Sequence, residues 1–97
     1  MANPFLAVPL SLNLIAASGG VPTLDVGPSC RAAEIAQACM ADEQDAHNQL
    51  VKAWTKFNIA DRATCVRTMM DFEPTYTELL TCLEMASEAR KLPEDLY

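Results

Sequence analysis

The sequence predicts an all-α domain, a small bundle of three to four short helices that is stabilised by disulfides and preceded by an irregular N-terminal leader. Residues 29–92 contain no glycine and one proline, Pro74, whereas strands would need turns more often. Apolar residues in this stretch recur at helical spacing. The chain has 97 residues and four cysteines, an even set that favours two disulfides in a short exported protein.

Residues 1–18 are predicted to be a signal peptide. No charged side chain precedes Asp25, and residues 5–17 form an apolar run that is too short to cross about 30 Å of hydrocarbon as a helix. Small residues follow, so we expect cleavage near Ser18 or Gly19. Because the run has no positive side chain before it, a disordered or loosely packed arm is the alternative. Residues 19–28, rich in glycine and proline, predict an extended linker to a helical domain of residues 29–97.

The first part of that domain predicts two helical stretches. Residues 29–38 are alanine-rich, which suits a short helix or the first part of a long bent one. Residues 39–57 predict a longer helix, in which Glu43 is the one misfit on the apolar stripe. The stripe consists of Cys39, Ala46, Leu50, Ala53, Trp54 and Phe57, and the opposite polar ribbon of Asp42, Asp45, Gln49, Lys52 and Lys56.

Two further helices are predicted by capping residues. Asn58 can cap a helix of about three turns with an apolar face of Ile59, Ala63, Val66, Met69 and Met70. Residues 71–74 predict a turn, and Thr75 with Glu78 forms a capping box for the last helix. Tyr76, Leu79, Leu80, Leu83 and Ala86 should face inward in this helix, and Thr77, Thr81, Glu84, Glu88 and Lys91 should face water.

The cysteine positions favour one pairing. If the last two helices form an antiparallel hairpin, the positions of Cys65 and Cys82 along the helix axes differ by only about 1.5 to 3 Å, so the two cysteines can form a disulfide. Cys30 then pairs with Cys39, which requires a break in residues 32–38, because an unbroken helix would hold them about 13.5 Å apart. Cys39 to Cys65 with Cys30 to Cys82 remains an alternative. The absence of closely spaced cysteines in the sequence argues against zinc.

Several motifs resemble a family of small secreted four-cysteine helical proteins of unknown function from alphaproteobacteria. The resemblance lies in a C-R-A-A start at Cys30, in residues 42–66 with their W-x-x-F motif, and in residues 75–92 with the motif Y-x-E-L-L-T-C-L-E-M-A. In that family the first two cysteines are usually further apart, often with a glycine between them. The resemblance implies a periplasmic location and paired cysteines, and it implies no activity or ligand.

Composition and motifs exclude several function classes. The formal charge of -6 argues against nucleic acid as a partner, because phosphate binding needs a basic stripe. The single histidine, His47, is expected to be a partly buried structural residue. The acidic cluster of Asp42, Glu43 and Asp45 is expected to be a solvated helix start rather than a calcium site. We therefore expect no catalytic, metal or cofactor site, no membrane span and no enzymatic activity.

A candidate apolar surface remains. It consists of Trp54, Phe57, Met69, Met70 and Tyr76, joined by Met85. Such a stripe is more often core than a binding site. Two functions are expected, a periplasmic or secreted interaction or structural module that binds another protein, or alternatively a small carrier of an apolar ligand. An exposed apolar patch would favour the first and an enclosed pocket the second.

Overall fold

The computed structural model describes residues 20–92, so the predicted signal peptide of residues 1–18 lies outside the described residues. Regular structure in residues 20–92 is all helical, which confirms the predicted fold class. The elements in chain order are α2 (Gly27–Arg31), α3 (Ala36–Ala53), the 3₁₀ helix η2 (Trp54–Lys56), α4 (Ile59–Asp71) and α5 (Tyr76–Arg90).

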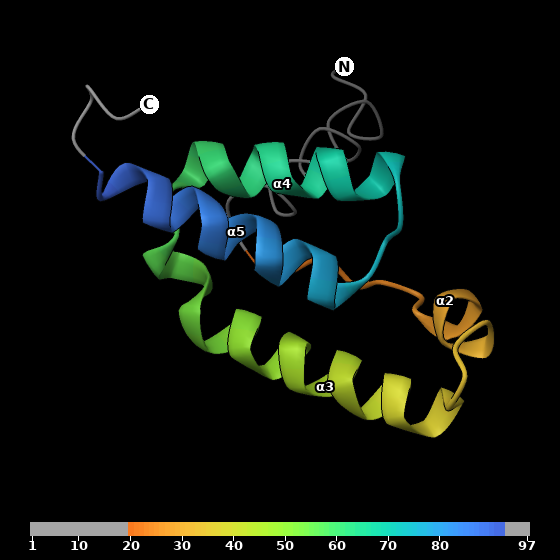
Figure 1. Ribbon diagram of the computed structural model, residues 1–97. Helices are drawn as coiled ribbons and strands as arrows, with labels where there is room; N and C mark the ends of the chain where they lie inside the picture. Colours follow the sequence, from red (N-terminus) through yellow and green to blue (C-terminus); the bar gives the residue numbers. More distant parts are fainter. Residues whose placement is uncertain (1–19, 93–97) are drawn as a thin grey trace, which may run out of the picture.

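Helix α5 lies between α3 and α4 and packs against both (Figure 1). Its inward side chains Leu79 and Leu83 are completely buried, as is Leu50 from α3. Each contributes about 2 kcal/mol by leaving water. The buried cluster comprises Val26, Ala46, Leu50, Trp54, Cys65, Met69, Tyr76, Leu79 and Leu83. The inward and outward faces predicted for α5 are therefore those observed.

The segment of residues 20–26 packs on the helices rather than standing apart from them. It has no regular structure and passes behind α5 in Figure 1. Val26 is buried, Val21 and Leu24 pack against the core, and the Leu24 amide donates to the Tyr76 hydroxyl at 2.9 Å. These residues, predicted as a linker, thus complete the core, because three of them are apolar side chains that gain from burial.

Both predicted disulfides are present. Cys65–Cys82 joins α4 to α5 with the α-carbons 5.7 Å apart, and Cys30–Cys39 joins α2 to α3 at 5.3 Å. Between Cys30 and Cys39 the chain leaves helical geometry at residues 32–35, which is the break that this pairing requires. The bridges therefore connect the four α-helices of residues 20–92 in two pairs.

Helix α4 is rotated relative to the predicted apolar face. Ile59 and Met70 are more than half exposed, and the inward positions are Arg62, Cys65 and Met69. The disulfide draws Cys65 toward α5, and the Arg62 guanidinium lies 5.5 Å from the centre of the Trp54 ring. A covalent bond and a cation–π contact thus set the rotation of a helix whose apolar pattern alone was ambiguous.

The predicted caps are present, with one change. Asn58 Oδ1 accepts hydrogen bonds from the Ala60 and Asp61 amides at the start of α4. Thr75 Oγ1 accepts from the Glu78 amide at 3.1 Å. The Thr75 amide donates to the Glu73 carbonyl at 2.8 Å. In a full capping box the Glu78 side chain would accept this hydrogen bond instead.

Glu43, the misfit on the α3 stripe, caps helix α5. It is only 4 % exposed, and its Oε1 accepts from the Tyr76 amide at 2.7 Å while Oε2 accepts from the Thr77 amide at 3.2 Å and from the Thr77 hydroxyl. The first amides of a helix have no partner within it, and its N-terminus favours negative charge. Glu43 and Thr75 together satisfy the first three amides of α5, so a buried carboxylate joins α3 to α5.

Replacing Glu43 with Ala should lower the free energy of unfolding by about 3 kcal/mol, because it leaves the buried Tyr76 amide, the part-buried Thr77 amide and the Thr77 hydroxyl without this acceptor. Glu43→Gln should cost less, since one amide oxygen still accepts. The exposed neighbour Asp42→Ala is the control and should change the value by less than about 0.5 kcal/mol. Urea unfolding of the three variants checks this, and equal effects of Glu43→Ala and Asp42→Ala would contradict it.

Cys82→Ser should lower the melting temperature appreciably, because a disulfide that closes a loop of this length contributes about 3 kcal/mol by restricting the unfolded chain. Thermal unfolding followed by circular dichroism measures the change. Intact mass before and after reduction of protein from its own host should also show two disulfides. Four free thiols in that protein, or an unchanged melting temperature, would contradict the expectation.

Candidate functional site

The five residues predicted as a candidate apolar surface do not form one. Trp54, Met69 and Tyr76 are buried in the core, and Phe57 is partly buried against it. Met70 alone is mostly exposed. The physical reason is that the helical spacing which brought these residues together in the sequence is the spacing of the core-facing stripe.

A hollow of about 260 Å³ lies beside Trp54. Its walls are Gly20, Val21, His47, Val51, Trp54 and Thr55. The indole N–H of Trp54 is shielded from solvent and has no acceptor within the part of the chain that the structure describes. Because a shielded N–H cannot reach a molecule in the hollow, Trp54 offers such a molecule a ring and no hydrogen bond.

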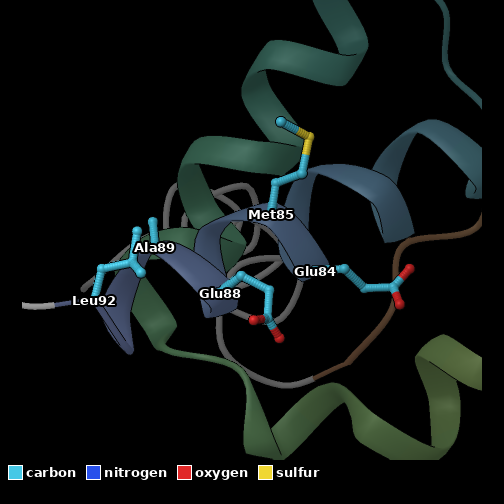
Figure 2. A pocket seen from close by; sticks show the side chains of 5 residues that line it. All are labelled: Glu84, Met85, Glu88, Ala89 and Leu92. Carbon is cyan, nitrogen blue, oxygen red and sulfur yellow. The ribbon is translucent and has the colours of Figure 1, made fainter. Parts of the chain in front are cut away.

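A larger hollow of about 440 Å³ lies on the outer face of α5, towards its C-terminal end (Figure 2). It is lined by Glu84, Met85, Glu88, Ala89 and Leu92. Met85 is 68 % exposed and Leu92 about half exposed, at 48 %. Met85 follows the buried Leu83 by two residues, about 200° around the helix, so it points away from the core. This face of α5 presents apolar side chains to solvent.

Carboxylates border this apolar surface. Figure 2 shows Glu84 and Glu88 extending from a different side of α5 than Met85. Lys91 Nζ lies 3.1 Å from Glu88 Oε1, in a pair whose two side chains are both more than two-thirds exposed. Exposed pairs of this kind contribute little stability. The surface therefore combines an apolar row with an acidic edge.

The base of this face is fixed by an ion pair between α5 and α4. Arg90 donates to both carboxylate oxygens of Asp61, from Nε at 2.6 Å and from a terminal nitrogen at 2.9 Å. The hydrogen bonds and charge of Arg90 lower the pKa of Asp61 below its ordinary value. This two-pronged contact holds the last turn of α5 against the first turn of α4.

The polar residues singled out in the sequence have structural positions. The partly buried His47 ring lies 4.4 Å from the Tyr76 ring, as expected for a structural histidine. Asp42 and Asp45 are exposed, whereas Glu43 points inward to α5, so the acidic cluster does not converge. Among residues 20–92, no group of three or more His, Cys, Asp or Glu side chains is placed to hold a metal ion.

The chain matches no protein-family profile, no curated protein sequence and no solved structure. None of the helices described here has the length and apolar character needed to cross a membrane.

Sequence reasoning missed the α5 surface as a unit. Met85 and Ala89 on α5, and Leu92 two residues beyond its end, stand at i, i+4 and i+7 and form a second apolar row beside the core stripe. The signal was present in this spacing. Glu84 and Glu88 directly precede Met85 and Ala89 in the sequence, so this side of the helix was predicted to face water as a whole and the apolar row was overlooked.

Two methionines of opposite burial test this assignment. Met69→Ala should lower the free energy of unfolding by about 2 to 5 kcal/mol, because it empties a core position, whereas Met85→Ala should change it by less than about 0.5 kcal/mol. Chemical unfolding of both variants gives the comparison. A large loss from Met85→Ala would mean that this side chain is part of the core.

Proposed function

We propose that this protein is a non-enzymatic interaction module that works in the periplasm or outside the cell and binds another protein through the outer face of α5. The observation that carries the proposal is the hollow bordered by Met85, Ala89 and Leu92, where apolar side chains face water. Exposed apolar patches with polar rims mark interaction sites on otherwise soluble proteins.

The composition of this face suits protein binding. Methionine is enriched in the centre of interfaces, and its flexible side chain adapts to a partner's shape. The face also lies on a helix that is held at three points, by Glu43 at its start, by Cys82 in its middle and by Arg90 at its end. A rigid surface binds with less loss of conformational entropy than a mobile one.

The proposed location rests on the cysteines and the leader. Two disulfides point to an oxidising compartment, since such bonds are rare in the cytosol. The uncharged apolar residues 5–17 and the small residues after them fit a signal peptide. The resemblance to small secreted alphaproteobacterial proteins supports the same location.

The alternative, a carrier for a small apolar ligand, has less support. Carriers enclose most of their ligand in a cavity lined by apolar groups. Both hollows described above open to solvent, and the one beside Trp54 is the smaller, about 260 Å³ against about 440 Å³ on α5. A shared face with a partner protein therefore fits the geometry better than an enclosed ligand.

Photo-cross-linking in the host organism tests the proposal. A photoreactive amino acid in place of Met85 should give one discrete cross-linked product on illumination. The control replaces Ile35, which is similarly exposed, at 65 % against 68 %, but lies before α3, and it should give no such product.

The outcome separates the two functions. A protein joined to position 85 and not to position 35 supports the interaction module. Absence of any product at position 85, together with a small molecule that co-purifies with the native protein and is seen by mass spectrometry, would replace it with the carrier.

A further inference from the structure

The α5 face carries two parallel rows of side chains with the same repeat. The apolar pair Met85 and Ala89 and the acidic pair Glu84 and Glu88 are each four residues apart, a rise of about 6 Å along the helix. The two rows are neighbours on the surface, and both glutamates are exposed. Any occupant of the hollow must bury apolar surface next to negative charge.

The charge of this face is only partly compensated. Glu88 has Lys91 as an exposed partner, and within the described residues the side chain of Glu84 forms no hydrogen bond or ion pair. The chain as a whole has a formal charge of -6. A positively charged occupant is therefore attracted to the face and gains most at Glu84.

Charge also decides among three occupants. The leader of this chain has no charged side chain before Asp25, so it supplies no lysine or arginine to Glu84 and Glu88. A second copy docked α5 against α5 would add the same two glutamates and, of the basic residues at this end of α5, Lys91 and Arg90, which already pair with Glu88 and Asp61, so it compensates the charge less well than a basic partner. A separate basic polypeptide avoids both problems.

We infer that the α5 face binds a cationic amphipathic helix of another protein, an inference that rests on the interaction function proposed above. An α-helix places side chains at i and i+4 about 6 Å apart, which matches the repeat of both rows. Aliphatic side chains of the partner fill the hollow between Met85 and Leu92. Lysine or arginine side chains on its flank lie beside Glu84 and Glu88. Helix-in-groove recognition uses this combination of apolar anchors and charged flanks.

A synthetic peptide provides the probe. It is a fluorescein-labelled helix of about five turns, made of leucine and lysine with the leucines on one face. Its binding to the full chain with both disulfides intact is followed by fluorescence anisotropy. A peptide of the same composition in scrambled order, which has the same charge and no apolar face, serves as the reference.

Two pairs of variants separate the local face from the overall charge. Glu84→Gln with Glu88→Gln should weaken binding of the amphipathic peptide about fivefold, because two exposed charge contacts are lost. Glu34→Gln with Asp42→Asn removes the same charge from exposed positions before and on α3 and should weaken it less than about twofold. Met85→Ser should weaken binding about tenfold.

Two results would overturn the inference. One is equal binding of the ordered and scrambled peptides, or equal weakening by the two double variants, since either would show attraction to net charge alone. The other is self-association of the wild-type chain that Glu84→Gln with Glu88→Gln strengthens, since the occupant would then be a second copy.

The cross-linking experiment keeps the two claims apart. If position 85 joins a host protein whose complex Glu84→Gln with Glu88→Gln leaves unchanged, the interaction function stands and the cationic-helix inference is wrong. If position 85 joins nothing, the interaction function itself fails.

Discussion

The arrangement of the helices depends on one buried carboxylate. Glu43 sits in the apolar stripe of α3, where an unpaired charge would be costly, and it is tolerated because three donors at the start of α5 meet it. The same contact fixes the position of α5 along its axis relative to α3. Tyr76, whose amide is held by Glu43, also accepts the Leu24 amide at its hydroxyl, so the N-terminal segment is tied to the same point. Apolar burial supplies most of the stability, and this polar contact selects which packing of the helices is formed.

The proposed binding surface is a consequence of that arrangement. The Tyr76–Leu79–Leu83 stripe of α5 is buried, Glu43 of α3 holds the start of α5, and Cys82 is bonded to α4. The opposite side of α5 has no described helix against it. Met85, Ala89 and Leu92 occupy that side together with Glu84 and Glu88. A helix that packs between two others normally exposes few apolar side chains. The exposed apolar row on α5 is therefore the feature of this fold that most calls for a functional explanation.

Local features were predictable from the sequence and long-range ones were not. Asn58 and Thr75 cap helices within three residues, and the hairpin places Cys65 near Cys82, so spacing alone sufficed for both. The role of Glu43 depends on a contact 33 residues away that no local pattern encodes. The rotation of α4 depends on the contact between Arg62 and Trp54, and the packing of residues 20–26 depends on their contact with Tyr76. Both contacts join segments that lie far apart in the sequence, so the apolar periodicity of one segment does not reveal them. The candidate apolar surface proved to be mostly core, the more common case for such a stripe, because helical spacing does not distinguish a core stripe from an exposed one.

Hydrogen exchange of the Tyr76 and Thr77 amides tests the central role of Glu43 most directly. The first amides of a helix usually exchange quickly, because no carbonyl within the helix accepts them. If the carboxylate of Glu43 holds them in a buried site, both should exchange as slowly as the core amides of α5 and become fast in Glu43→Ala. Rapid exchange of these two amides in the wild-type protein, in step with an exposed helix start, would contradict the account.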